Sequence, residues 1–504
     1  MNKKMLPVFQ PFTQRERKVN PLVQSMANAS LTANDAPTQA SSLSKVVDLF
    51  FQIAAMRAQE DETVIRVFDA AFAQSPEQTL KVLFWARDVR QGQGERRVFR
   101  VIVKHLANTN TSAISSLIRL VPTYGRWDDV LAFIDTPCEP VALDVISNAL
   151  KSGDALCAKW MPREKSSKKS IAYKIRKSMG LSSRSYRKLL SSATKVVETN
   201  MCANKWDDIE YQRVPSQAMN IYKGAFERHS PEVWKAYMDA LSSGEKKVSA
   251  GAIYPHQILA PYIAQPDKSM PAISQHQWAA LPDWLADNPF RILPVVDTSG
   301  SMYSSYNDGV STRPIDVSVS LGLYIAERNT GPFKNHFVTF SEKPKMQSLS
   351  GESLGERLMS VSSAEWGYNT DLVRTFNAIL HHAKHAGATS SDMPDMILIL
   401  SDMEFDSATK YPNETAMQSI RREYGEAGYE LPKIVFWNLN ARPGNVPVSF
   451  DKNGTALVSG FSPTIMKSLL AGGEFTPVGI MLKTILDSRY ESVLFTQEEK
   501  LCRS

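Results

Sequence analysis

Two apolar runs that each end in an aspartate carry the clearest chemistry in this sequence. Arg291-Ile-Leu-Pro-Val-Val-Asp297-Thr-Ser299-Gly-Ser301 predicts a buried parallel strand followed by a carboxylate and two hydroxyls. Met396-Ile-Leu-Ile-Leu-Ser-Asp402 predicts a second strand that also ends in a carboxylate. Such strand ends lie at the edge where open α/β sheets bind ligands. Because hard cations such as Mg²⁺ prefer carboxylate and hydroxyl oxygens, we expect a divalent-cation site at this edge.

The spacing Asp297-x-Ser299-x-Ser301 resembles the metal-ion-dependent adhesion site (MIDAS) of von Willebrand factor A domains. The resemblance implies two further ligands, Thr370 before an amphipathic helical stretch and Asp402. It also implies Mg²⁺, or another divalent cation such as Mn²⁺ or Ca²⁺, with one position open for an Asp or Glu carboxylate of a partner protein. A plainer interpretation stays open, in which the two aspartates cap helices and the serines form turns.

Two further acids follow the second strand. Glu404 and Asp406 could lie behind the cation ligands and support them, or they could be solvated, and we expect the solvated arrangement.

Length and composition predict a globular protein of two or three domains. The chain has 504 residues, 43% of them hydrophobic and 22% charged. No apolar run is long enough to span a membrane, and the basic start lacks the apolar core of a secretory signal. The four cysteines are scattered without a Cys-x-x-Cys pair, which predicts neither zinc nor disulfides and fits a reducing cytoplasm. We expect a cytoplasmic monomer without membrane contact.

The hydrophobic pattern divides the chain into four parts. Residues 1–43 are polar and aperiodic, which predicts a flexible N-terminal arm. Residues 44–288 show helical spacing and almost no strand signal, which indicates an α-helical repeat (HEAT-like) solenoid or ring. Within this part, the proline-rich stretch 255–289 predicts a linker or irregular packing. Residues 289–475 alternate strands and helices, and residues 476–504 form a C-terminal tail that could pack on the helical domain.

The third part predicts a doubly wound, mostly parallel sheet, giving a multidomain α + α/β protein. Strands are expected at 292–296, 336–340, 396–400, 433–438 and 455–459, with helices at 317–327, 354–360, 372–386, 415–427 and 464–470.

One segment of the helical part is strongly basic. Between Lys159 and Lys195 there are twelve Lys or Arg residues and a single acid, Glu164. Interleaved serines and two tyrosines add groups suited to phosphate contact and base stacking. We therefore expect an RNA-binding face, with a solvated helix surface as the alternative. The candidate RNA-binding residues are Lys165, Lys168, Lys169, Lys174, Arg176, Lys177, Arg184, Arg187 and Lys188.

The combination of a helical half and a metal loop resembles the Ro autoantigen family, which joins a helical TROVE module to a von Willebrand factor A (Rossmann-like) domain. A closer resemblance is to the domain-of-unknown-function 2828 family. It is carried by Leu31-Thr-Ala-Asn, Val47-Val-Asp-Leu-Phe-Phe, the stretch from Trp85 to Arg100, Tyr124-Gly-Arg-Trp-Asp-Asp, Lys159-Trp-Met-Pro-Arg-Glu and Ala250-Gly-Ala-Ile-Tyr-Pro-His. The likeness to Ro proteins implies binding of small structured or misfolded RNA.

A group of arginines within this family stretch has two interpretations. Arg87, Arg90, Arg96, Arg97 and Arg100 surround a Gly-x-Gly turn, where they could contact phosphate. They could equally pair with acids such as Asp88 and Glu95 and hold the helices together.

We expect a non-enzymatic RNA-binding scaffold with a cation-dependent protein ligand. One alternative is a metal-dependent protein-interaction adaptor that does not bind RNA. Another is a metal-dependent phosphoryl hydrolase, which the sequence favours less because Ser299 and Ser301 have no histidine motif near them.

Overall fold

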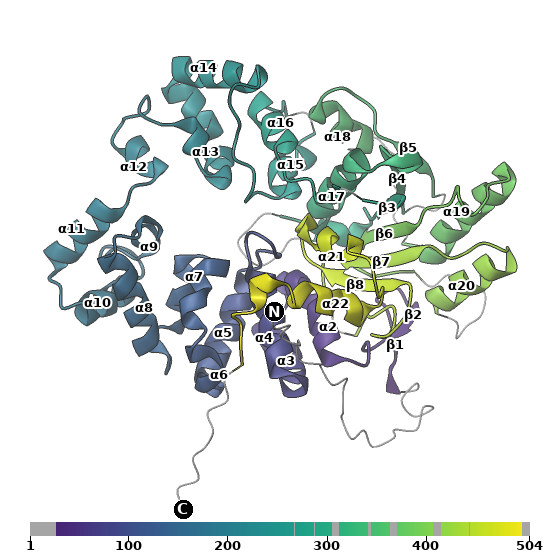
Figure 1. Ribbon diagram of the computed structural model, residues 1–504, viewed down its shortest axis with the longest axis horizontal. Coiled ribbons are helices and arrows are strands. Elements are labelled where there is room, and N and C mark those ends of the chain that lie inside the picture. Colours follow the sequence, from purple (N-terminus) through teal and green to yellow (C-terminus); the bar gives the residue numbers. More distant parts are fainter. Residues whose placement is uncertain are drawn as a thin grey trace, which may run out of the picture.

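The computed structural model describes residues 27–266, 268–286, 288–304, 312–340, 344–362, 370–406, 415–442 and 444–495. The ends of the expected arm and tail, 1–26 and 496–504, therefore lie outside the described residues. Helices dominate the chain up to residue 280, and a sheet with helices on its faces follows (Figure 1). None of the helices in the described ranges combines the length and apolar character needed to cross a bilayer.

The helical region contains fifteen α-helices in the described residues. The first eight are α2 (Lys45–Gln52), α3 (Asp61–Gln74), α4 (Pro76–Arg87), α5 (Arg97–Thr109), α6 (Thr111–Ser115), α7 (Val121–Tyr124), α8 (Glu139–Lys151) and α9 (Ala155–Trp160). The others are α10 (Lys169–Ser178), α11 (Ser183–Ala193), α12 (Val197–Cys202), α13 (Ser216–His229), α14 (Pro231–Ser242), α15 (Pro255–Ile263) and α16 (Ala272–Ala279). Most of these helices pack against neighbours in the sequence, as the helical spacing predicts.

These helices trace an arc whose two ends both rest on the α/β part (Figure 1). At one end α2 packs on the last strand of the sheet, and at the other α15 packs on α17 (Pro314–Arg328). The sheet region therefore closes the arc, and the helices do not close on themselves.

The proline-rich stretch 255–289 contains two helices, α15 and α16, with irregular segments between and after them. The expectation of a linker was therefore wrong, and irregular packing describes only part of the stretch. Pro255 is the first residue of α15, and Pro271 directly precedes α16. Proline is well tolerated at such positions because its missing N–H would be unpaired there anyway. Proline content alone therefore could not separate a linker from two helix starts.

The sheet has six strands in the described residues, in the order β5-β4-β3-β6-β7-β8. They are β3 (Ile292–Val296), β4 (His336–Thr339), β5 (Met346–Ser348), β6 (Met396–Ser401), β7 (Lys433–Asn438) and β8 (Thr455–Ser459). All neighbours are parallel except β5, which runs antiparallel to β4 at the edge. If the six strands are renumbered 1 to 6 in the order of the chain, their order across the sheet is 3-2-1-4-5-6, which is the doubly wound order. The expected parallel sheet is confirmed, and β5 is an addition that the sequence did not indicate.

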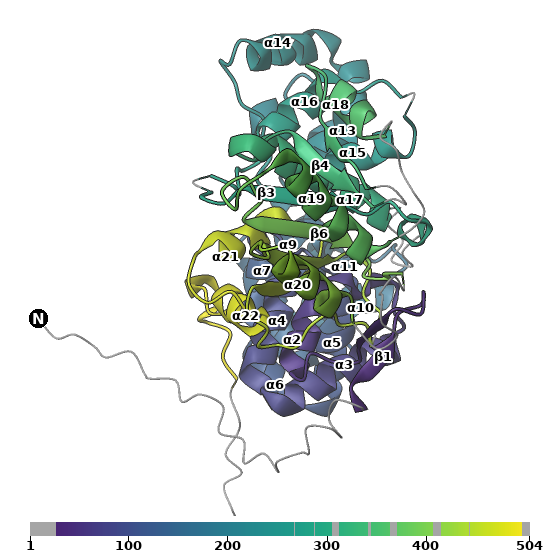
Figure 2. The ribbon, with the colours of Figure 1, turned by 90° about the vertical axis from the view of Figure 1, so that its right-hand side faces the viewer.

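Helices cover both faces of this sheet. Helix α17 lies on the face that looks toward the helical arc, and α19 (Leu372–Ala386) and α20 (Ala416–Glu426) lie on the other face (Figures 1 and 2). Strands β3 and β6 are buried at every position, which explains why their sequences are continuous apolar runs. The remaining helices are α18 (Leu354–Ser362), α21 (Met466–Leu470) and α22 (Pro477–Ile485).

Residues 27–43 do not form the expected flexible arm. Short strands β1 (Ala29–Leu31) and β2 (Pro37–Gln39) pair as a hairpin, and the backbone of Gln39 bonds with that of Val446 at 2.9 and 3.1 Å. The Thr32 hydroxyl also donates to the carbonyl of Phe405 at 2.7 Å. Because these partners lie about 370–410 positions away in the chain, local periodicity could not reveal this order.

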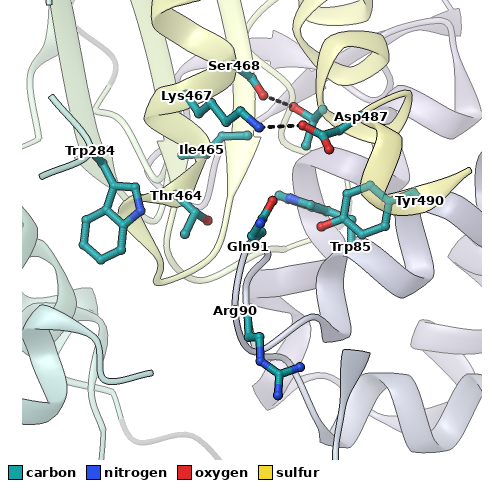
Figure 3. Close-up of a pocket in the computed structure, with 11 residues that line it drawn as sticks. Trp85, Arg90, Gln91, Trp284, Thr464, Ile465, Lys467, Ser468, Asp487 and Tyr490 are labelled. Carbon is teal, nitrogen blue, oxygen red and sulfur yellow. Dashed lines mark hydrogen bonds and ion pairs between the residues drawn. The ribbon is translucent and has the colours of Figure 1, made fainter. Parts of the chain in front are cut away.

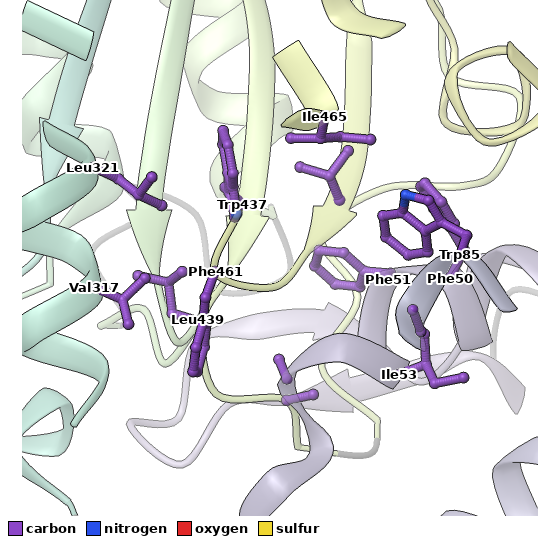
Figure 4. Packing of buried hydrophobic residues seen from close by; sticks show 14 of the residues in the cluster. Phe50, Phe51, Ile53, Trp85, Val317, Leu321, Trp437, Leu439, Phe461 and Ile465 are labelled. Atoms are coloured by element: carbon purple, nitrogen blue, oxygen red, sulfur yellow. The ribbon is translucent and has the colours of Figure 1, made fainter. Parts of the chain in front are cut away.

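The helical and α/β parts share one hydrophobic core. Phe50, Phe51 and Trp85 from α2 and α4 pack toward Trp437 and Phe461 at the end of the sheet (Figure 4). Polar bonds cross the same boundary, since the Ser459 hydroxyl donates to the carbonyl of Phe50 at 2.8 Å. The two parts are therefore joined by buried apolar surface and are not beads on a linker.

The end of the chain reinforces this junction. Helix α22 packs on both β8 and α4. Beyond it, Arg489 donates to the buried carboxylate of Asp88 at 2.7 Å, and the Tyr490 hydroxyl donates to the same carboxylate at 3.1 Å. This tail thus contacts the helical part through a charged pair that was not visible in the sequence.

Candidate metal centre

The two aspartate-terminated strands are neighbours in the sheet. β3 and β6 pair in parallel, with Val296 opposite Leu400, so Asp297 and Asp402 both lie just beyond the same edge. Along the chain, β3 is the first strand of the sheet and β6 is the fourth. The chain continues from β3 to β4 on one side of this pair, and from β6 to β7 on the other side. This is the topological switch point, where open α/β sheets form a crevice for ligands.

Asp297 is fully buried and held by hydrogen bonds within the loop. Its Oδ1 accepts the backbone N–H of Ser299 at 2.9 Å, and its Oδ2 accepts the hydroxyl of Ser401 at 2.5 Å. The hydroxyls of Ser299 and Ser301 lie 3.1 Å apart. A short 3-10 helix, Gly300–Tyr303, begins directly after Ser299 and turns both hydroxyls into the loop. Asp297, Ser299 and Ser301 thus form one oxygen-rich group.

Asp402 places a second buried carboxylate beside the first. Burial, and then the negative charge of Asp402, raise the pKa of Asp297 to about 7. Burial also raises the pKa of Asp402, and the nearby Ser301 hydroxyl and Arg442 offset part of this effect. Oδ2 of Asp402 has no hydrogen-bond partner among the described residues. Two adjacent buried carboxylates with an unpaired oxygen form a strong potential cation ligand set.

Thr370 lies on the loop next to these groups. Its backbone N–H donates to Asp406 at 2.7 Å, and its hydroxyl donates to the carbonyl of Glu404 at 2.7 Å. The hydroxyl oxygen keeps its lone pairs for a cation, because both bonds use donors of Thr370. The structure therefore ties the Thr370 loop to the loop that follows Asp402.

Glu404 is not solvated, so that expectation was wrong. Its side chain is buried and accepts the backbone N–H of Ala33 at 2.6 Å, with Arg442 at 3.6 Å. Asp406 is half-buried through its bond to Thr370. The N-terminal hairpin thus covers the Glu404 carboxylate, which sequence position alone could not show.

Ser401 and Met403 were missed by the sequence reasoning. The Ser401 hydroxyl donates to Asp297 and accepts the N–H of Met403 at 3.0 Å. Met403 has a φ of +67°, a left-handed conformation that is costly for a side chain of this size. The serine just before Asp402 was the available signal, and its role depends on the strand register.

The donor set fits a hard divalent cation. Carboxylate and hydroxyl oxygens suit Mg²⁺, Mn²⁺ or Ca²⁺ and not a thiol- or imidazole-seeking metal. Within the described residues no group of three or more His, Cys, Asp or Glu side chains gathers around a common point. The two carboxylates would therefore not be enough to bind a cation, and the hydroxyls of Ser299, Ser301 and Thr370 would have to serve as ligands too.

The candidate RNA-binding residues lie far from this edge. Helices α10 and α11 form the outermost part of the arc, on the side away from the sheet (Figure 1). Seven of the candidates are exposed and make no ion pair with another described residue: Lys165, Lys168, Lys169, Lys177, Arg184, Arg187 and Lys188. Lys174 pairs with Asp135 and Glu139 at 2.5 and 2.6 Å, and Arg176 pairs with Glu164 at 2.9 Å. These two are thus partly committed to structural contacts.

The arginines around the Gly-x-Gly turn are largely structural. Arg87 is buried against Asp129, with its Nη2 at 2.6 Å, and Arg100 donates to the same carboxylate at 2.6 Å. Arg97 pairs with Asp61 at 2.5 Å. Arg96 differs, because it makes no ion pair with any other residue that the structure describes.

A separate pocket of about 250 Å³ lies where the helical and α/β parts meet (Figure 3). Trp85, Trp284 and Tyr490 contribute to its walls. Two of its charged groups, Lys467 and Asp487, form an ion pair at 2.6 Å, and the third, Arg90, donates to the carbonyl of Thr123 at 3.0 Å. We therefore assign this pocket no ligand.

Two family models match the chain. The family described as domain of unknown function (DUF2828) matches residues 32–123 and 100–288, and that described as domain of unknown function (DUF7788) matches residues 291–497. "Uncharacterized protein L728" of Acanthamoeba polyphaga mimivirus is 29% identical over 513 residues, which cover 91% of this chain and 88% of that protein. Among solved structures, the Ro (RSR) protein of Deinococcus radiodurans is 14% identical, with a TM-score of 0.44 over 88% of this chain and 99% of that one.

Proposed function

The chain belongs to the family described as domain of unknown function 2828, and from that premise we propose that it is a non-enzymatic scaffold with a divalent-cation site of the von Willebrand factor A type. The observation that carries this proposal is the pair of buried carboxylates, Asp297 and Asp402, that follow neighbouring parallel strands. The strand order supports it, because the pair lies at the switch point of the sheet.

Each ligand would have a distinct role. Ser299, Ser301 and Thr370 would bind the ion through their hydroxyl oxygens, and Asp297 and Asp402 would bind directly or through water. A bound Mg²⁺ would offer an open position to the carboxylate of a partner protein. The mutual hydrogen bond of the Ser299 and Ser301 hydroxyls supports a ligand role for them, and not the role of an activated nucleophile.

Cation binding should stabilise the protein measurably. A ligand at a hundred times its Kd adds about 2.7 kcal/mol to the free energy of unfolding. We expect millimolar Mg²⁺ to raise the midpoint of thermal unfolding relative to EDTA, and a Ser299→Ala/Ser301→Ala double variant to lose most of this rise. Differential scanning fluorimetry measures both. An equal rise in the double variant would contradict the assignment of these ligands.

RNA binding is the second function that a specific observation favours. Seven exposed basic side chains on and around α10 and α11 lack acidic partners among the described residues, which leaves their charge available for phosphates. RNA is also the ligand that the resemblance to Ro proteins implies. Such binding would depend on phosphate contacts, with weak preference for sequence and strong dependence on salt.

A salt titration tests this function. We expect the triple variant Arg184→Gln/Arg187→Gln/Lys188→Gln to bind mixed RNA more weakly, with the slope of log K against log salt reduced by about one for each lost phosphate contact. Fluorescence anisotropy measures the slope. A matched triple variant, Lys235→Gln/Lys384→Gln/Lys452→Gln, removes equal exposed charge elsewhere and should bind like the native protein. If neither the native protein nor the variants bind RNA at low salt, a metal-dependent protein adaptor becomes the better description.

A further inference from the structure

A second pocket, of about 420 Å³, lies between early and late helices of the arc, and all its arginines come from the early ones. Arg57, Arg87, Arg96 and Arg97 reach it from the early helices, and Arg126 from the segment before the 3-10 helix Trp127–Phe133. The opposite wall comes from α13 and α15, through residues such as Gln217 and Gln257. The pocket therefore has a positively charged wall facing a polar one.

The acids around this wall do not balance its arginines. With Arg100, which shares two of their acidic partners, the arginines number six, and the described residues that form ion pairs with them are four: Asp61, Glu95, Asp128 and Asp129. Asp128 and Asp129 are each shared by two arginines. Within the described part of the chain, the arginines of this cluster therefore outnumber the acids that pair with them.

Arg96 differs from the other arginines of this group. It lines the pocket without an ion pair or side-chain hydrogen bond to any described residue. Burial, and then the neighbouring Arg126 and Arg100, lower the pKa of Arg96 below its usual range, and the charge of Asp128 offsets only part of this effect. A half-buried guanidinium repelled by others destabilises the free protein unless an anion relieves it. Its five donors suit the oxygens of a phosphate group in particular.

A larger pocket, of about 810 Å³, adjoins the 420 Å³ pocket. The two share Arg126, Gln217 and Ile221 in their walls. The larger one offers apolar surface, because Ile221 is 67% exposed and Leu156 55%. The guanidinium of Arg126 lies over the ring of Trp160 at 4.1 Å, which adds a flat surface at the passage between the pockets. Together they match a ligand with an anionic end and a planar or apolar body.

We propose that this double pocket binds a mononucleotide, with its phosphate against Arg96 and Arg126 and its base and sugar over Ile221. None of the residues that line the double pocket belongs to the cation site or to α10 or α11, so this site is separate from both proposed functions. A mononucleotide fits the observations better than free phosphate, since free phosphate would leave the larger pocket unfilled.

Isothermal titration with AMP, inorganic phosphate and adenosine tests the proposal on the full chain. We expect AMP to bind the native protein, inorganic phosphate to bind more weakly, and adenosine to bind least. Arg96→Gln should weaken AMP binding at least tenfold, and Arg96→Lys should restore only part of it. Arg66→Gln on α3 changes an exposed arginine outside the pocket, and as the matched control it should leave AMP binding unchanged.

The variants also separate a ligand site from a structural one. Without nucleotide, Arg96→Gln should unfold at the same temperature as the native protein or at a higher one, because it removes repulsion. A lower temperature would give Arg96 a structural role and overturn the proposal. Failure of AMP to bind at millimolar concentration, equal affinity for AMP and inorganic phosphate, or an effect of Arg96→Gln on RNA alone would each overturn it as well.

Discussion

Replacing Asp297 with Asn should stabilise the cation-free protein and abolish its stabilisation by Mg²⁺. The substitution keeps the shape of the side chain and removes one of two adjacent buried negative charges. Since each pKa unit corresponds to about 1.4 kcal/mol, relief of this repulsion should add of the order of 1–4 kcal/mol to the free energy of unfolding above pH 7. The same change removes an anionic oxygen from the site, so the response to Mg²⁺ should disappear.

The effect of Asp297 should depend on pH with a definite sign. Its folded-state pKa of about 7 lies above the ordinary value of an aspartate, so the folded state holds the proton more tightly than the unfolded state. In EDTA, the contribution of this group is therefore most favourable at low pH and is lost as the pH rises toward 7. Asp297→Asn should be more stable than the native protein at pH 8, and the difference should shrink toward pH 5. Urea unfolding at several pH values measures it.

Asp395 offers a matched control at the opposite edge of the sheet. It directly precedes β6 and pairs with Arg291 at 2.5 Å. Asp395→Asn should weaken this pair, lower stability modestly and keep the full response to Mg²⁺. If Asp297→Asn were less stable than the native protein in EDTA at pH 8, or if it kept the Mg²⁺ response, Asp297 would be a structural residue and not a ligand.

The local sequence pattern was sufficient to predict the residues of the site that directly follow the strands. A buried parallel strand must be apolar on both faces, so β3 and β6 stand out in the sequence and their terminal aspartates can be located. The roles of Ser401 and Glu404 could not be located in this way. Ser401 reaches Asp297 only through strand register, and Glu404 is buried by a hairpin that lies about 370 residues earlier in the chain.

The same limit applies to the helical part. Helical spacing predicted the succession of helices, because most of them pack on helices close to them in the sequence. It could not decide whether the arginines near the Gly-x-Gly turn bind phosphate or acids. Arg87 finds Asp129 across 42 residues, whereas Arg96 finds no such partner among the described residues. Identical residue types a few positions apart thus have opposite roles, and only their tertiary environment separates them.

Asp129→Ala should be the most damaging single substitution in the helical part, with a loss of about 3–5 kcal/mol. The carboxylate is fully buried and accepts three hydrogen bonds, from Arg87 at 2.8 Å, from Arg100 at 2.6 Å and from the backbone N–H of Arg126 at 2.8 Å. The Nη2 of Arg87 also forms an ion pair with it at 2.6 Å. Its removal leaves the buried Arg87 without a counter-charge and adds to the positive charge around Arg96. Urea unfolding followed by circular dichroism measures the loss.

A variant of the neighbouring Asp128 tests whether burial or net charge causes the loss of stability in Asp129→Ala. It also binds Arg100 and Arg126, at 2.7 and 2.9 Å, but these two arginines are partly exposed to water. Asp128→Ala removes the same formal charge and should cost only about 1 kcal/mol, because water can solvate the arginines that it leaves. Equal losses for the two variants would mean that net charge, and not the buried contact with Arg87, sets the stability of this region.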